Sequence, residues 1–387
     1  MEITELQSIY SKHPNIGTLE KILRDNSVKT VFLKGLCASS AALLASSFLK
    51  KQEYPFVFIL GDLEEAGYFY HDLIQINGEG RTLFFPSSYR RAIKYGQKDA
   101  ANEILRTEVL SRLQKSSEPL CIVTYPDALA EKVVSLQELS DKTLKLHKGE
   151  QVDTTFITEV LSGYGFERVD YVYEPGQTQY AVRGSIIDVF SFSSEYPFRI
   201  DFFGDEVESI RTFEVESQLS KERKESIAIV PELTRNSGDE ISFLDFLPGN
   251  TMLAMKDFLW VRERIQAVHD EALSPQALAI QEDEERAEFN LEKKLIDGSE
   301  FTVKALDFRR IEFGNKPTGT PQATITFDCS PQPIFHKNFD LVSTSFKEYL
   351  SNGYTLYICS DSTKQTDRIR AIFQDRNDDY GIRQNIA

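Results

Sequence analysis

The segment from Gly35 to Ala42, GLCASSAA, is a candidate for phosphate chemistry because it lies between an expected strand and an expected helix. In a working loop of the GxxxxGK(S/T) type, the second glycine lets the backbone wrap the phosphates, the lysine reaches the β and γ phosphates, and the hydroxyl holds Mg²⁺. In this sequence those three positions carry Ser40, Ala41 and Ala42. The segment is therefore predicted to be a degenerate phosphate loop, and ATP hydrolysis by this chain is not expected.

Acidic side chains follow another expected strand, at residues 56–60. Asp62, Glu64 and Glu65 imitate a magnesium-binding motif, but the start of a helix explains them more simply, because the helix macrodipole favours carboxylates there. Histidines and cysteines stand singly, without the spacing of metal ligands or of a disulfide framework: His13, His71, His147, His269, His336, Cys37, Cys121, Cys329 and Cys359. No metal site is predicted, and the scattered cysteines fit a reducing cytoplasm.

The segment FRIDFF at residues 198–203 points to binding rather than catalysis. Side chains alternate between the two faces of a strand, so three apolar side chains should face the core while Arg199, Asp201 and Phe203 face the other way. A cation, an anion and an aromatic ring in one row suit a protein interface, because arginine and aromatic residues are frequent binding hot spots. On the residues alone, an ion pair between Arg183 and Asp201 within the sheet is an equally good interpretation.

Residues 174–213 carry the most specific sequence motifs of the chain. The strings EPG, AVRG, IDVF and RIDFFGDEVESIR occur there in this order, and they closely resemble a module shared by the UvrB family and the transcription-repair coupling factor (Mfd) family. In both families the module docks UvrA, the damage-recognition ATPase. The resemblance implies that Arg183, Arg199 and Asp201 contact UvrA from an exposed face of the module, with Arg168 as a fourth member.

The chain departs from the family's sequence motif at Thr178-Gln179. The family reads EPGQFAVRG or EPGQYAVRG, whereas this chain reads EPGQTQYAVRG, with two extra residues. An insertion at the entry to a strand can be absorbed as a longer turn or a bulge. The strand that carries Arg183 is therefore expected to keep its register.

Short apolar runs alternate with amphipathic segments through residues 1–130, which is typical of a parallel sheet covered by helices on both faces. Strands are expected at 30–33, 56–60, 82–85 and 120–124, and helices at 39–50, 63–74 and 99–114. Antiparallel strands with a turn at Gly204-Asp205 follow a helix expected at 155–163. Beyond them the pattern predicts a charged helix near 281–294, a loop at 316–322, a helix at 343–351, a strand at 354–359 and a helix at 362–374.

Domain boundaries follow from these patterns and from the resemblance. The fold class is α/β: a degenerate P-loop domain, similar to RecA and UvrB, spans 1–145 and 216–325 and is interrupted by the β-rich UvrA-docking module at 146–215. Residues 326–387 are expected to form a small, truncated α/β domain, because the sequence stops where another strand should form. The resemblance implies that the two parts of the interrupted domain fold together.

The formal net charge of −16 disfavours a chain that grips DNA by itself, since non-specific affinity comes from lysine and arginine neutralising phosphates. Arg90, Arg91 and Lys94 lie where UvrB carries a long hairpin that inserts into damaged DNA, but the segment is too short for that hairpin and is better interpreted as a solvated loop. The N-terminus lacks a signal-peptide pattern, and the apolar run at 36–49 is shorter than the roughly 20 residues that span a bilayer. A cytoplasmic protein without a membrane partner is expected.

The resemblance implies a non-catalytic scaffold that recruits UvrA to stalled transcription sites for nucleotide excision repair and needs no cofactor of its own. ATP and magnesium would be bound by the translocase lobes of the parent protein, and RNA polymerase by its further domains. Two alternatives stay open. One is an ATP-dependent DNA translocase or helicase lobe, against which the degenerate loop argues. The other is a clamp in which the docking surface is held against the protein's own translocase lobes.

Overall fold

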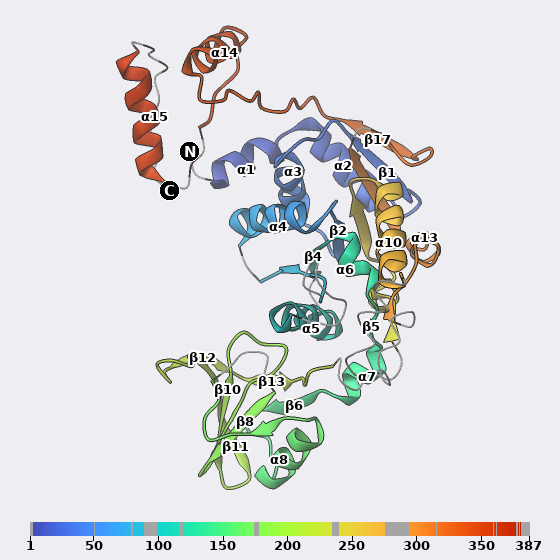
Figure 1. The fold of residues 1–387 in the computed structure, drawn as a ribbon, viewed down its shortest axis with the longest axis vertical. Helices are drawn as coiled ribbons and strands as arrows, with labels where there is room; N and C mark the ends of the chain where they lie inside the picture. Colours follow the sequence, from blue (N-terminus) through green and yellow to red (C-terminus); the bar gives the residue numbers. More distant parts are fainter. Residues whose placement is uncertain are drawn as a thin grey trace.

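The computed structural model describes residues 3–49, 51–78, 80–88, 99–115, 119–173, 178–233, 240–274, 294–314 and 316–376 except Cys359 and Asp361, together with Asp378 and Tyr380. Three of the segments singled out in the sequence lie outside the described residues: the EPGQ string at 174–177, most of the expected charged helix at 281–293, and the loop with Arg90, Arg91 and Lys94. Figure 1 shows a larger α/β part, a β-rich module at one end of it and two C-terminal helices at the other.

Seven parallel strands form the larger sheet, in the order β17-β1-β16-β15-β2-β4-β3. Most of their side chains are apolar and buried, as expected for a sheet covered on both faces. Strands that follow the module, β15 to β17, pair with strands that precede it, β1 and β2, so neither part of the chain forms the sheet alone. The bounds are β1 Thr30–Lys34, β2 Phe56–Ile59, β3 Thr82–Phe84, β4 Cys121–Thr124, β15 Met252–Met255, β16 Arg309–Gly314 and β17 Ala323–Thr326.

Helices cover both faces of this sheet. One group consists of α1 (Ile3–Ser11), α2 (Pro14–Arg24), α3 (Ser40–Leu49) and α4 (Leu63–Asn77), which contact one another. The other consists of α6 (Pro126–Ala130), α9 (Phe243–Phe246), α10 (Phe258–Ala272) and α13 (Gly298–Ala305), and Figure 1 shows the two groups on opposite sides of the strands. In the chain, α5 (Ala100–Lys115) follows β3 and precedes β4. The parallel sheet, its first four strands and their helices are thereby confirmed, with small differences at the ends.

The chain passes from the larger α/β part into the β-rich module and back again through two pairs of antiparallel strands. After β5 (Val133–Val134) and α7 (Leu136–Asp141), β6 (Leu144–His147) pairs antiparallel with β13 (Ser226–Ile229), and β14 (Glu240–Ile241) then pairs with β5. Between β6 and β13 lie α8 (Thr154–Gly163) and a six-stranded sheet of order β12-β11-β10-β9-β8-β7. Its strands are β7 Glu167–Arg168, β8 Gln179–Arg183, β9 Ile186–Val189, β10 Phe198–Phe203, β11 Glu206–Phe213 and β12 Ser220–Lys224.

The module has its own apolar core on one side of this sheet. Ile157 and Leu161 of α8 pack there against inward side chains of the strands, among them Ile187, Ile200 and Val207. The alternation predicted for β10 is confirmed, because Phe198, Ile200 and Phe202 are buried while Arg199, Asp201 and Phe203 are not. Gly204 and Asp205 form the expected turn, and the positive φ of 62° at Gly204 explains why glycine suits this position. The opposite side of the sheet is therefore available for polar chemistry.

The C-terminal unit differs from the expected α/β pattern. Both expected helices are present, as α14 (Phe339–Ser351) and α15 (Thr363–Asp375), and they pack through aromatic rings of Phe346, Phe373 and Tyr380. The expected strand at 354–359 is wrong over its described part, because residues 354–358 form no strand. A strand needs a neighbour to pair with, and the described residues offer none to this segment. The domain boundaries assigned from the sequence stay predictions. Among the described residues, no helix is long and apolar enough to cross a membrane.

Candidate protein-docking face

The loop at residues 35–42, where a phosphate would bind, contacts the protein's own backbone and apolar side chains. Gly35 has a φ of 87°, and a Cβ atom placed on it would lie 2.1 Å from the carbonyl oxygen of Phe327. Ser40 begins α3, and its hydroxyl accepts a hydrogen bond from the Cys37 N–H (2.8 Å) and donates one to the Cys37 carbonyl (2.6 Å). Both the nearby backbone and this hydroxyl are therefore already engaged within the protein.

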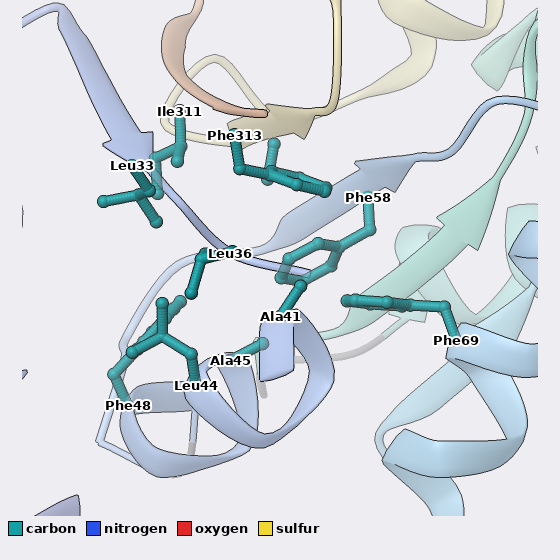
Figure 2. Close-up of a pocket in the computed structure, with 11 residues that line it drawn as sticks. Leu33, Leu36, Ala41, Leu44, Ala45, Phe48, Phe58, Phe69, Ile311 and Phe313 are labelled. Carbon is teal, nitrogen blue, oxygen red and sulfur yellow. The ribbon is translucent and has the colours of Figure 1, made fainter. Parts of the chain in front are cut away.

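Ala41 and Ala42, at the lysine and hydroxyl positions of a working loop, face the interior. Ala41 lines a small apolar cavity of about 10 Å³ together with Phe58, Phe69 and Phe313, as Figure 2 shows, and Ala42 is fully buried. A cavity of this volume holds at most one water molecule. The acidic residues beyond β2 also have local roles: Asp62 caps α4 by accepting the Glu65 N–H, which confirms the helix-start interpretation. No group of metal-binding side chains occurs among the described residues.

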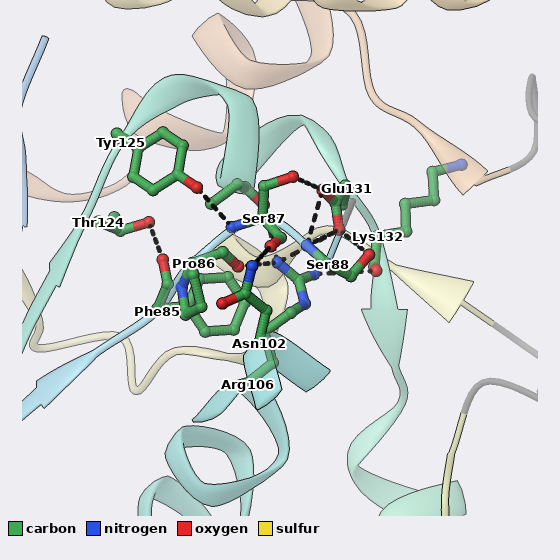
Figure 3. Close-up of polar contacts among 11 residues, drawn as sticks. Phe85, Pro86, Ser87, Ser88, Asn102, Arg106, Thr124, Tyr125, Glu131 and Lys132 are labelled. Carbon is green, nitrogen blue, oxygen red and sulfur yellow. Dashed lines mark hydrogen bonds and ion pairs between the residues drawn. The ribbon is translucent and has the colours of Figure 1, made fainter. Parts of the chain in front are cut away.

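A buried ion pair fixes the chain where it leaves β3. Arg106 of α5 lies 3.5 Å from Glu131, and Glu131 accepts hydrogen bonds from the backbone N–H and the hydroxyl of Ser88, at 3.0 and 2.6 Å (Figure 3). The guanidinium stacks 4.2 Å from the ring centre of Phe85. Tyr125 accepts the Ser87 N–H, and burial raises the pKa of Tyr125 to about 12. The hydrogen bonds of this cluster all connect parts of the chain to one another, so the cluster is structural.

Asp188 is the centre of the polar face of the six-stranded sheet. It lies on β9 directly opposite Arg199 of β10, and its side chain is only 1% exposed. Arg199 donates to both carboxylate oxygens, through Nε at 2.7 Å and Nη2 at 2.8 Å, and Arg183 of β8 donates to the same carboxylate. The hydrogen bonds that Arg199 donates to Asp188 raise the pKa of Arg199. Two guanidinium groups are thereby fixed by one buried carboxylate.

The expectation that Arg183 and Arg199 both lie on an exposed surface is half wrong. The Arg199 side chain is 12% exposed, because it is held by Asp188 and stacks 4.2 Å from the ring centre of Phe213. Arg183 is 33% exposed and stacks over the exposed ring of Tyr171, at 4.6 Å. Arg183 therefore remains available to a partner, whereas the charge of Arg199 is already compensated within the sheet.

The proposed ion pair between Arg183 and Asp201 is not formed. Arg183 pairs with Asp188 instead, while Asp201 lies 3.7 Å from Arg211 and accepts a hydrogen bond of 3.2 Å from Ser185. The cross-strand register explains this, because Asp201 is opposite Ile186 of β9 and Ser209 of β11 rather than opposite a residue of β8. Asp201 is 26% exposed and shares the polar face.

Phe203 and Arg168 differ in position. Phe203 ends β10 and is 78% exposed, which leaves its ring accessible to a partner. Arg168 is exposed on β7, but its register partner is Tyr180, whose side chain lies in the core. Paired residues of neighbouring strands point to the same side of a sheet, so Arg168 does not share the face of Arg199. The structure thus brings four of the five predicted contact residues to one face.

The two extra residues at Thr178-Gln179 leave the register of β8 intact, as predicted. Gln179 begins the strand, and the pairs from Tyr180–Val189 to Arg183–Ile186 continue without a shift. Three members of the face were missed by sequence reasoning: Asp188, Tyr171 and Arg211. The alternation in IDVF could have placed Asp188 on the polar side, but its pairing with two arginines depends on a register that the sequence does not reveal.

Comparisons with known proteins identify the module. A family model described as the UvrB interaction domain matches residues 144–234, which begin at the first residue of β6 and end shortly after β13. The chain is 26% identical to the transcription-repair-coupling factor of Escherichia coli K12 over 197 residues, 51% of this chain and 17% of the relative. The factor of Bacillus subtilis 168 is 28% identical over 205 residues, covering 53% and 17%, and that of Haemophilus influenzae is 33% identical over 126 residues, covering 33% and 11%.

These matches cover less than a fifth of the length of the relatives. They also agree in name across several bacteria. The chain therefore matches the UvrB interaction domain at residues 144–234 and is similar to the transcription-repair-coupling factors over about half of its own length.

Proposed function

We propose that the chain is a non-catalytic scaffold whose module docks UvrA and thereby brings excision repair to stalled transcription sites. The observation that carries this proposal is the coincidence of the UvrB interaction domain match with the structural module from β6 to β13. The module is joined to the rest of the chain by paired strands, so its docking face is held in a defined position.

The polar face of the six-stranded sheet is the best candidate for the docking surface. The other face is covered by α8 and by the module's core, whereas the polar face combines exposed aromatic rings at Tyr171 and Phe203 with guanidinium groups. Side chains that are already fixed lose little entropy when a partner binds, which favours affinity. Aromatic and arginine side chains are also the commonest binding hot spots.

The non-catalytic part of the proposal is supported by the loop between β1 and α3. The carbonyl of Phe327 lies against Gly35, and Ala41 faces a cavity that is too small for a phosphate. The lysine that would reach the β and γ phosphates has no counterpart in the loop. A role as an ATP-driven translocase lobe is therefore the weaker alternative.

Phe203→Ala tests the docking surface with little risk to folding, because the ring is 78% exposed. Binding of purified UvrA to the chain is measured by calorimetry. If Phe203 is a hot spot, its loss should cost about 2 kcal/mol, or roughly thirtyfold in Kd. The matched control is Phe156→Ala: this ring is 52% exposed on α8, which packs on the core side of the same sheet.

The proposal predicts that Phe203→Ala weakens UvrA binding while Phe156→Ala does not, with unchanged thermal melting of both variants. Failure of the wild-type chain to bind UvrA would contradict the function itself. Equal affinity of wild type and Phe203→Ala would instead show that UvrA uses another part of the module.

A further inference from the structure

Two cysteines that stand far apart in the sequence lie close together in the fold. Cys37 and Cys329 are separated by 292 positions (329 − 37). Cys37 lies three residues beyond Lys34, the end of β1, and Cys329 lies three residues beyond the end of β17. Lys34 and Thr326, which end these parallel strands, are register partners, and the Phe327 N–H donates to the Lys34 carbonyl at 2.8 Å. The two cysteines therefore follow neighbouring strands at the same edge of the sheet.

The hydroxyl of Ser40 connects the two cysteines. It accepts a hydrogen bond from the Cys37 N–H at 2.8 Å and donates one to the Cys37 carbonyl at 2.6 Å. The Cys329 thiol forms a hydrogen bond with the same hydroxyl. Tyr10 of α1 lies near both thiols, because burial raises the pKa of Tyr10 and the neighbouring Cys329 and Cys37 raise it further. Contacts with α1 and α3 thus bring both cysteines to one small region.

The two thiols are also accessible. Both are free and partly exposed, whereas Cys121 of β4 is buried, and burial raises the pKa of the Cys121 thiol. Because the thiolate is the reactive form and must be reached by its reagent, Cys121 is expected to be inert. A zinc site is a poorer interpretation of the pair, since no group of three metal-binding side chains occurs in the part of the chain that the structure describes.

We propose that Cys37 and Cys329 form a thiol-modification site, which a small-molecule disulfide such as oxidised glutathione converts into an intramolecular disulfide. Burial raises the pKa of the Cys329 thiol, so the Cys37 thiolate attacks first. The S–S bond of glutathione breaks, and the leaving glutathione thiolate takes up a proton. The Cys329 thiolate then attacks the sulfur of Cys37 in the mixed disulfide and releases the second glutathione. The two protein thiols are oxidised and oxidised glutathione is reduced to two thiols, so no other oxidant is needed.

The new bond would fix one edge of the large sheet. β17 is the last strand in the sheet and pairs only with β1. Residues 327–338 connect it to α14 and the C-terminal unit. A covalent link just beyond β1 and β17 keeps their ends together when the hydrogen bonds break, so full opening of β17 becomes rarer. In reducing compartments such disulfides are usually transient, as a reversible switch requires. Oxidation therefore determines how firmly β17 and the unit beyond it are held.

The first test incubates the full chain with oxidised glutathione and maps its peptides by mass spectrometry without reduction. The variants are Cys37→Ser and Cys329→Ser, and the control is Cys359→Ser, at a cysteine that lies outside the described residues. Wild type and control should yield a peptide pair joined through Cys37 and Cys329. Cys329→Ser should instead carry glutathione on Cys37, and Cys37→Ser should give no cross-link to Cys329.

A trivalent arsenical tests the proximity of the thiols without oxidation. Wild type and Cys359→Ser should bind it about a hundredfold more tightly than Cys37→Ser or Cys329→Ser, because binding of the second thiol is intramolecular. Thermal melting of each variant checks that it is folded. The mapping and the arsenical titration of the wild type need no variant, so the proposal stays testable if one variant does not fold.

Hydrogen exchange at residues 323–326 measures the effect on β17. Exchange should slow when the wild type is oxidised and stay unchanged in either variant. The proposal is overturned if the wild type forms only single-thiol adducts, if its disulfide joins other cysteines, or if loss of Cys37 or Cys329 leaves arsenical binding unchanged. Unchanged exchange in fully cross-linked wild type would overturn the role assigned to β17.

Discussion

Changing Asp188 to asparagine tests whether one buried carboxylate organises the polar face of the six-stranded sheet. The side chain is 1% exposed and accepts hydrogen bonds from both Arg199 and Arg183. Asparagine has nearly the same shape, but it carries no charge and keeps only one acceptor oxygen. The substitution leaves the guanidinium of Arg199, which is 12% exposed, without the carboxylate that pairs with it.

The expected loss follows from the burial of the pair. Removing one partner of a buried ion pair costs about 3–5 kcal/mol, because the other charge stays in a region that water reaches poorly. Arg183 adds less, since its side chain is 33% exposed and water replaces part of its contact. We therefore expect Asp188→Asn to destabilise the module by about 3–5 kcal/mol. The matched control, Asp201→Asn, should cost about 1 kcal/mol or less, because Asp201 is 26% exposed and 3.7 Å from its partner.

Hydrogen exchange followed by mass spectrometry measures the free energy of opening of β8, β9 and β10 in each variant. Trp260, the one tryptophan of the chain, lies on α10, so its fluorescence during urea unfolding reports on the larger α/β part. The urea midpoint of this transition should be the same in each variant as in the wild type. Adding Arg199→Met to Asp188→Asn should recover part of the loss, because removing both charges leaves no unpaired buried ion. The reasoning is refuted if Asp188→Asn costs no more than Asp201→Asn, or if the double variant is less stable than the single one.

Three further outcomes are expected. Calorimetry with ATP and Mg²⁺ should detect no binding of micromolar affinity, because the loop lacks the lysine and hydroxyl that hold phosphate and metal, and a saturable isotherm would contradict this. Mobility shifts with duplex DNA at physiological salt should give no complex, since the net charge is −16, whereas a submicromolar, salt-sensitive complex would restore a DNA-binding role for the segment 89–98. Gly35→Ala should lower the free energy of unfolding by more than about 2 kcal/mol, because the alanine would have a positive φ and its Cβ would clash with the Phe327 carbonyl. The control Gly149→Ala, whose φ is 80° with nothing within 4 Å of the added Cβ, should lower it by only about 1–2 kcal/mol. Equal losses in chemical denaturation would count against the clash.

Features governed by local sequence were predictable, and the position of the module's core is one of them. The alternation in FRIDFF assigned Phe198, Ile200 and Phe202 to the interior because a strand has a period of two residues. Continuous apolar runs at β2 and β4 likewise indicated strands buried on both faces. Each of these inferences needs only the residues of one strand.

Features that depend on pairing between strands were not predictable. Arg183 pairs with Asp188 rather than Asp201 because of the β8–β9 register, and Arg168 lies off the polar face because its register partner on β8 is the core residue Tyr180. The apolar segment at 354–358 has the composition of a strand, yet it forms none, because a strand is stabilised by a neighbour that local composition does not specify.

The interleaved order of the large sheet has a consequence for the timing of folding. Thr30 of β1 pairs with Arg310 of β16, 280 positions later in the chain (310 − 30), whereas β8 to β12 pair with their immediate neighbours. Contacts between distant residues form slowly, and a ribosome adding roughly 5–20 residues per second needs tens of seconds to supply β16. During that interval the apolar residues of β1 lack their final neighbours and are open to chaperones or aggregation. Synthesis therefore completes the β-rich module before the sheet that carries it.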